Sequence, residues 1–133
     1  MPTIEISKKD LESLVGKKFT QKELEDALMY VKGEIDAIDG DNIKVDVKDT
    51  LRPDVWSTEG IAREIRARMG MGKIKYNVAA AKVSCTIEQT VERVRPFIAC
   101  AIVRGVKVTE NFLFQIIQLQ EKVGMTFGRK RDH

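Results

Sequence analysis

Residues 34–47 read EIDAIDGDNIKVDV, and this pattern predicts a β-hairpin. Two runs with apolar residues at alternate positions, Glu34–Ile38 and Ile43–Val47, flank the turn-forming residues Asp39–Asn42. Polar residues separate the apolar ones in the second run, so one face of the hairpin should pack on a core and the other should lie in water. A further alternating run, Thr3–Ile6, predicts a short strand before it.

The hairpin is rich in aspartate, which raises the alternative of a calcium-binding loop. The register of the residues argues against that alternative. With Gly40 at the sixth position of such a loop, Ile35 and Ala37 occupy the positions of the first ligands, and neither side chain can bind a cation. We therefore interpret the segment as a turn in water.

Two short helices are predicted before the hairpin. Ser7 caps the first helix, and Gly16 ends it by adopting the left-handed conformation common at helix ends. Thr20 and Glu23 form the capping-box pattern at the start of the second helix, and Gly33 is expected to end it.

A third helix is predicted over about Thr58–Met69, with Ser57 as its cap. Its buried side is expected to carry Ile61, Ile65 and Met69. Trp56 is expected to fill the core beside the helix start. Gly70-Met71-Gly72 ends the helix, and we place a domain boundary there.

The second half of the chain is expected to contain strands and one long helix. Strand-like runs cover Ile74–Val78, Lys82–Ile87 and Phe97–Val103. The last run is apolar on both faces, which is typical of the middle of a sheet. Cys85 and Cys100 lie within these runs, so they are expected to be buried as small hydrophobic residues.

The long helix is predicted from its cap, Thr109, to about Met125. Its apolar side consists of Phe112, Ile116, Leu119 and Val123, widened by Leu113 and Ile117. Too little chain remains to cover this helix and the doubly apolar strand. The predicted fold is therefore α+β: a small N-terminal domain, residues 1–72, with two helices, a β-hairpin and a third helix, followed by an incomplete α/β piece, residues 73–133.

The composition is that of an ordinary globular protein, with 133 residues, 43% hydrophobic and 32% charged. A net charge of +3 is too small to demand a nucleic-acid partner, although basic residues gather in 59–75 and 129–131. The sequence shows neither a signal-peptide pattern nor an apolar run long enough to span a bilayer, so we expect a cytoplasmic protein.

Chemical groups for catalysis are scarce. His133 is the one histidine, so no Ser-His-Asp or Cys-His set can be assembled. Two cysteines and one histidine cannot make a four-ligand zinc site, and Gly70-Met71-Gly72 lacks the spacing of a phosphate-binding loop. We therefore assign no catalytic residue, metal site or cofactor to this chain.

Seven residues are candidates for contact with nucleic acid or a partner subunit. Arg52 and Asp54 flank a proline that presents their side chains reproducibly, although they could instead pair with each other or cap the next helix. Arg63 and Arg66 project from that helix. The basic end could contact phosphate or complement a helix dipole, and it consists of Arg129, Lys130 and Arg131.

An ordered series of motifs runs along nearly the whole chain. It starts with MPTI at 1–4 and GKKFT at 16–20, and it continues with Arg52-Pro53-Asp54 and EGIAR at 59–63. Later members are RPF at 95–97, VRGVK at 103–107, QLQEK at 118–122 and GRKR at 128–131. This series resembles the β subunits of archaeal and eukaryotic phenylalanyl-tRNA synthetases. The family has Asn directly before Arg-Pro-Asp, where this chain has Leu51, which leaves room for a diverged paralogue or an altered sequence.

The resemblance implies a class II ligase, an αβ heterotetramer that attaches phenylalanine to its tRNA with ATP and magnesium. It also implies that residues 1–72 match the small N-terminal domain of the β subunit and that residues 73–133 begin a truncated editing domain. The expected partners are the phenylalanyl-tRNA synthetase α subunit and tRNA, and the chain alone is expected to be inactive.

Two alternatives stay open. The chain could be a free-standing paralogue that binds nucleic acid through its basic clusters. It could also be a structural adaptor, in which the helix over 110–125 buries its surplus apolar surface in a homodimer.

Overall fold

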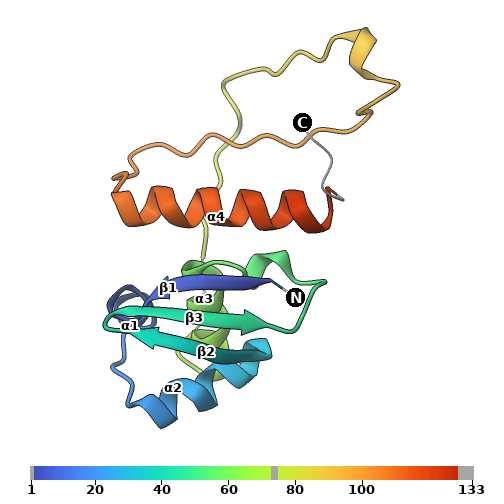
Figure 1. Ribbon diagram of the computed structural model, residues 1–133. Helices are drawn as coiled ribbons and strands as arrows, with labels where there is room; N and C mark the ends of the chain where they lie inside the picture. The colour runs from blue at the N-terminus through green and yellow to red at the C-terminus, as the bar shows by residue number, and fades with distance from the viewer. Residues whose placement is uncertain (1, 73–74, 129–133) are drawn as a thin grey trace. The chain divides into compact units, whose positions relative to one another are not determined.

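A computed structural model describes residues 2–72 and 75–128 (Figure 1). The chain divides into two compact units. Unit 1 comprises the described parts of 1–74 and 109–133, and unit 2 comprises 75–108. The α+β class predicted from the sequence is confirmed, because helices and an antiparallel sheet make up unit 1.

The sheet has three strands in the order β1-β3-β2, all antiparallel to their neighbours. They are β1 (Thr3–Ser7), β2 (Gly33–Asp39) and β3 (Asn42–Val47). The predicted hairpin is β2 and β3, in which Asp39 pairs with Asn42 across a turn where Gly40 has a φ of 58°. A bulge between Ile35 and Ala37 interrupts the register of β2, the strand at one edge of the sheet.

The two faces of the sheet differ in polarity, as the alternation predicts. The face toward the core carries Ile4, Ile6, Ile43, Val45 and Val47, all of them buried. These side chains share one cluster with residues from three helices, so the helices cover this face. The opposite face is polar: Thr3 donates a 2.6 Å hydrogen bond to Asp46, and Lys44 lies 3.6 Å from Glu5.

Helix α1 (Lys8–Val15) begins and ends as predicted. The Ser7 hydroxyl accepts a hydrogen bond from the Asp10 amide, and Gly16 adopts a φ of 82° at the other end. The hairpin turn adds a second cap, because the Asp41 carboxylate accepts hydrogen bonds from the Ser7 hydroxyl at 2.6 Å and from the Lys9 amide at 2.9 Å. The Ser7 bond is the main reason that the pKa of Asp41 is lowered.

Helix α2 (Gln21–Leu28) starts with the predicted capping box of Thr20 and Glu23. The predicted end at Gly33 is wrong. A 3₁₀ turn over Met29–Val31 follows α2, and Lys32 takes the left-handed conformation with a φ of 51°. Gly33 is instead the first residue of β2, where a Cβ would lie 3.0 Å from the Val45 side chain, so its small size serves strand packing.

Helix α3 (Thr58–Arg68) follows a 3₁₀ turn over Pro53–Val55. The Ser57 hydroxyl caps it as predicted, by accepting a hydrogen bond from the Gly60 amide. Trp56 is fully buried, which confirms its assignment to the core. Met69 is 36% exposed and does not join the core, because α3 has already ended and the chain turns at Gly70.

Helix α4 (Glu110–Thr126) has the predicted cap, Thr109. Its predicted apolar face is only partly correct. Leu119 and Val123 pack against the core cluster, but Ile116 is 45% exposed. Leu113 and Ile117, which were expected to widen the buried face, are half exposed as well. The residues of α4 that are buried are two glutamines, Gln115 and Gln118.

Unit 2 contradicts the predicted strands. Residues 75–78, 82–87 and 97–103 form no strand, and a 3₁₀ turn over Gln89–Val91 is the one regular element within 75–108. Strands need neighbours for their backbone hydrogen bonds, and unit 2 supplies none. Every residue from 75 to 108 is exposed, including Cys85 and Cys100, so the prediction that these thiols are buried is wrong. Residue 74, the predicted start of the first strand, lies outside the described residues.

The domain division predicted at residues 72 and 73 concerns a longer protein and stays a prediction. Within this chain, the described part of 109–133 belongs to the same compact unit as the N-terminal sheet.

Candidate functional site

Arg52 and Asp54 form a bidentate ion pair across Pro53. The Arg52 guanidinium donates from Nε to Asp54 Oδ1 at 3.0 Å and from Nη2 to Asp54 Oδ2 at 2.8 Å. Two parallel bonds of this kind are the strongest arrangement between these side chains. The Asp54 hydrogen bond raises the pKa of Arg52, and the Arg52 hydrogen bond lowers the pKa of Asp54.

Helix α3 joins this pair into a network. Arg63 Nη2 donates to Asp54 Oδ2 at 2.8 Å, and Arg52 Nη2 donates to Glu64 Oε2 at 3.1 Å. Arg68 Nε also donates to Glu64, at 2.9 Å. The network thus ties the segment before α3 to the exposed side of the helix. Its arginines are about half exposed, so each pair contributes little to stability, on the order of 0.5 kcal/mol.

Arg66 lies apart from this network and serves the end of α1. Its Nη1 donates to the Val15 carbonyl at 2.8 Å and approaches the Leu14 carbonyl at 3.4 Å, and its Nη2 donates to the Met71 carbonyl at 3.3 Å. The last carbonyls of a helix lack partners within the helix and carry partial negative charge, so a guanidinium satisfies both needs.

The structure therefore brings three of the predicted contact residues together, Arg52, Asp54 and Arg63, and separates Arg66 from them. All four make hydrogen bonds within the chain. Arg129, Lys130 and Arg131 lie outside the described residues. Contact of these seven residues with nucleic acid or a partner subunit stays a prediction.

Leu51, at the position where the resemblance implies Asn, is 81% exposed. Its amide donates a 3.1 Å hydrogen bond to the Asp49 carboxylate, and that bond does not depend on the residue's own side chain. The Trp56 indole donates to the carbonyl of the same Asp49 at 3.2 Å. Neither of these two contacts uses the Leu51 side chain.

Sequence reasoning missed two buried polar residues of α4. Gln115 is 2% exposed and Gln118 is 8% exposed, although both lie in a helix with many apolar residues. Gln115 Oε1 accepts from the Thr58 amide at 3.1 Å, and Gln115 Nε2 donates to the Glu5 carbonyl at 2.9 Å. A buried polar side chain needs partners, and the partners of these glutamines are distant in the sequence.

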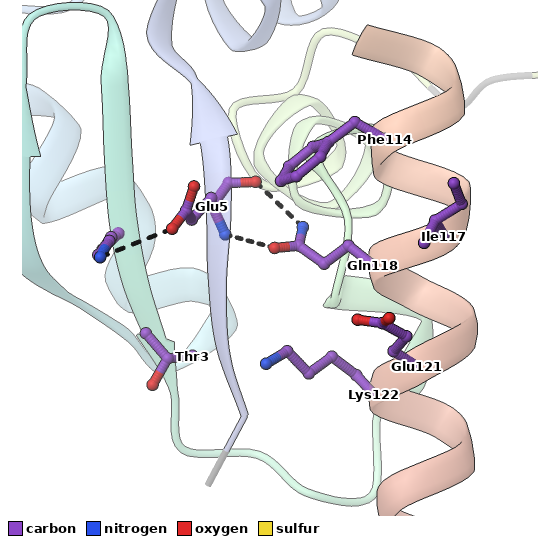
Figure 2. Close-up of a pocket in the computed structure, with 8 residues that line it drawn as sticks. Thr3, Glu5, Phe114, Ile117, Gln118, Glu121 and Lys122 are labelled. Carbon is purple, nitrogen blue, oxygen red and sulfur yellow. Dashed lines mark hydrogen bonds and ion pairs between the residues drawn. The ribbon is translucent and has the colours of Figure 1, made fainter. Parts of the chain in front are cut away.

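A surface groove of about 360 Å³ runs beside these contacts, between β1, β3 and α4. Figure 2 shows Gln118 reaching from α4 to the backbone of Glu5, with Phe114 above it and Lys122 below it. The sheet side contributes the polar side chains of Thr3, Glu5 and Lys44. The helix side contributes the apolar side chains of Phe114 and Ile117 and the charged side chains of Glu121 and Lys122, so both walls of the groove carry charge.

Among residues 2–72 and 75–128, no three His, Cys, Asp or Glu side chains form a group that could hold a metal ion. In that same part of the chain, none of the helices is both long enough and apolar enough to cross a bilayer.

No family model matches the chain. Individual relatives match it over nearly its whole length. The phenylalanine–tRNA ligase β subunits of Pyrococcus horikoshii, Thermococcus kodakarensis and Pyrobaculum aerophilum are 43%, 45% and 37% identical to it across 98% of this chain. The chain spans about a quarter of the length of these relatives.

A solved structure agrees with this result. The crystal structure of an N-terminal fragment of the phenylalanyl-tRNA synthetase β subunit from Pyrococcus horikoshii matches with a TM-score of 0.88 and 41% sequence identity. The match covers 99% of this chain and 40% of that fragment. The resemblance found in the sequence motifs is thereby confirmed, and the chain is a homologue of the N-terminal region of archaeal phenylalanine–tRNA ligase β subunits.

Proposed function

We propose that the chain is a structural, non-catalytic part of the β subunit of a phenylalanine–tRNA ligase. In the complete enzyme, the β subunit would work with an α subunit that attaches phenylalanine to tRNA in the cytoplasm, using ATP and magnesium. The observation that carries this proposal is the match in sequence and fold to the N-terminal region of the β subunit over nearly the whole chain.

The arrangement of charged side chains supports a structural role. Arg52, Asp54, Arg63 and Glu64 bond one another, and Arg66 bonds backbone carbonyls. In this proposal ATP and magnesium are assigned to the remainder of the ligase, and no chemical step is derived from these residues.

A chimera tests the proposal. Residues 1–133 would replace the matching N-terminal region of the Pyrococcus horikoshii β subunit, which would be produced with the α subunit of that organism. We expect the two subunits to copurify and to charge tRNA with phenylalanine at a rate close to that of the parent enzyme. A chimeric β subunit that is soluble but does not assemble with the α subunit would contradict the proposal.

The isolated chain provides the complementary test. Purified residues 1–133 should neither charge tRNA with phenylalanine nor hydrolyse tyrosyl-tRNA. Either activity above the background of a mock purification would refute the non-catalytic assignment. Direct tRNA contact, the remaining part of the proposal, should appear as salt-dependent binding that weakens when Arg129, Lys130 and Arg131 become alanine.

The exposed apolar side of α4 supports a second candidate, an adaptor that forms a homodimer. Leu113, Phe114, Ile116 and Ile117 are each about half exposed, and soluble monomers rarely present so many neighbouring apolar side chains. Sedimentation equilibrium would then show a dimer that Ile116→Asp dissociates. A monomer at all concentrations would leave only the ligase-subunit proposal.

A further inference from the structure

Strand β1 is an edge strand of the sheet, because β3 is its neighbour on one side and none of the strands within 2–72 and 75–128 lies on the other. The outer edge of such a strand presents N–H and C=O groups at alternate residues, and another chain can add a strand there. Native proteins protect these edges, since strand addition leads to unwanted association.

Gln118 occupies the outer edge of β1 at Glu5 (Figure 2). Its Oε1 accepts from the Glu5 amide at 2.7 Å, and its Nε2 donates to the Glu5 carbonyl at 3.0 Å. A side-chain amide presents a carbonyl and an N–H group next to each other. Gln118 therefore makes with Glu5 the two hydrogen bonds that one residue of a fourth strand would make.

Gln115, about one helical turn before Gln118, also bonds the outer edge of β1. Its Nε2 also donates to the Glu5 carbonyl, at 2.9 Å, so that carbonyl accepts two hydrogen bonds. Its Oε1 accepts from the amide of Thr58, the first residue of α3, which holds the side chain in place from the opposite direction.

The burial of both glutamines needs an explanation, because apolar residues would fill the same space. Leu119 and Val123 on the same helix already provide apolar packing against the core. With apolar residues at 115 and 118, the Glu5 amide and carbonyl would lose their partners and would be left for water or for a foreign strand.

We propose that Gln115 and Gln118 close the β1 edge against strand addition, with Gln118 taking the place of one residue of a fourth strand. The strand they exclude is one from a second copy of this chain. The closure is a property of the fold and does not depend on the ligase function.

The test uses Gln118→Met in the 133-residue chain, because Met keeps the length and helix preference of Gln but cannot make the two hydrogen bonds. At a dilution where the variant is monomeric, we expect the Glu5 amide to exchange with deuterium about tenfold faster, since one to two lost hydrogen bonds correspond to about 1.4 kcal/mol. At higher protein concentration we expect species larger than those of the wild type in sedimentation velocity. Gln120→Met, at an exposed position of the same helix, is the matched control.

Glu5→Pro identifies the surface involved, because it removes the N–H group that an added strand would need. The double variant Gln118→Met/Glu5→Pro should return to the association state of the wild type, with circular dichroism confirming that both variants fold. Unchanged exchange at Glu5 in the diluted, monomeric Gln118→Met variant would overturn the proposal. Association that persists in the double variant would overturn it as well, and so would a change of equal size in Gln120→Met.

Discussion

Gly60 lies in the first turn of α3, directly against the 3₁₀ turn over Pro53–Val55. A Cβ at this position would overlap the backbone carbonyl of Asp54 and would press on the backbone of Val55. Both of these groups are main chain, so neither can move without shifting the segment that carries Asp54 into its ion pairs. The absence of a side chain at Gly60 therefore sets the distance between α3 and the Arg-Pro-Asp segment.

Gly60→Ala should lower the free energy of unfolding by about 3 kcal/mol or more, because the clash can be relieved only by moving backbone. Urea denaturation followed by circular dichroism measures this change. Gly124→Ala is the matched control, since Gly124 lies in α4 with open space around its Cβ position. We expect this change to raise the free energy of unfolding by about 0.5–1 kcal/mol. Equal effects of the two changes would contradict the assignment of the clash.

The arginines make different kinds of contact: some pair with carboxylates and one bonds backbone carbonyls. The sequence predicts only some of these contacts. The pairing of Arg52 with Asp54 was one of the alternatives predicted, because the two residues are neighbours across a proline. The bond from Arg66 to the Val15 carbonyl joins residues far apart in the chain, so only the packing of α3 beside α1 reveals it. Exposed arginines on one helix therefore gave no indication of which would be used internally.

At the level of elements, helix starts follow their sequence signals closely. The start of α2 has a complete capping box: the Thr20 hydroxyl accepts a hydrogen bond from the Glu23 amide, and Glu23 Oε2 accepts one from the Thr20 amide at 2.8 Å. Glu23 also pairs with Lys17 at 2.9 Å. These contacts, led by the Thr20 backbone hydrogen bond, lower the pKa of Glu23 from its ordinary 4.5 to about 2.

This lowered pKa predicts how the stability of α2 depends on pH. Because the folded state holds Glu23 in its charged form, the contribution is present above about pH 4.5 and is lost as the pH falls toward 2. The melting temperature of the wild type should exceed that of Glu23→Gln at pH 6, and the two should converge near pH 2. Glu25→Gln, which removes a carboxylate of α2 outside the capping box, is the control for the loss of one charge from the helix. A constant difference between wild type and Glu23→Gln from pH 6 to 2 would refute the prediction.

The sequence predicted the elements of unit 1 well because their signals are local. Caps, turn residues and alternating apolar residues lie within a few positions of the structure that they determine. The docking of α4 was not predictable in this way, because the hydrogen-bond partners of Gln115 and Gln118 lie on β1 and α3, far away in the sequence. The prediction of strands within 75–108 was wrong for a related reason: an apolar run forms a strand only when a neighbouring strand is present.

For the whole molecule, the main feature is that unit 1 is discontinuous in sequence. The chain leaves the unit after α3 and returns at Thr109, so that α4 completes a structure begun by residues 2–72. Besides the glutamine bonds, Phe127 lies 6.0 Å from Trp56 between ring centroids, and Asn111 donates to Asp10 at 2.8 Å. Contacts near both ends and in the middle of α4 therefore hold it to the rest of unit 1.

Cutting the chain within unit 2 should leave unit 1 assembled. A site for a specific protease would be inserted after Gly105, a position with open space around its Cβ. We expect the two fragments to elute together in size-exclusion chromatography and to separate in denaturant. The same cut in a Gln115→Ala/Gln118→Ala background should release part of the C-terminal fragment, since a buried amide group would lose its partner. Complete separation of the wild-type fragments under native conditions would show that α4 is not held by the rest of unit 1.

The return of α4 has a consequence for the order of events on the ribosome. Strands β1, β2 and β3 and helices α1–α3 leave the ribosome first, and all of their mutual contacts can form at that point. The residues from 73 to 126 then take about 3 to 11 seconds to add, at roughly 5–20 residues per second. During that interval the nascent chain carries a folded sheet whose outer strand has no cover, and neighbouring nascent chains on the same messenger RNA present the same bare strand.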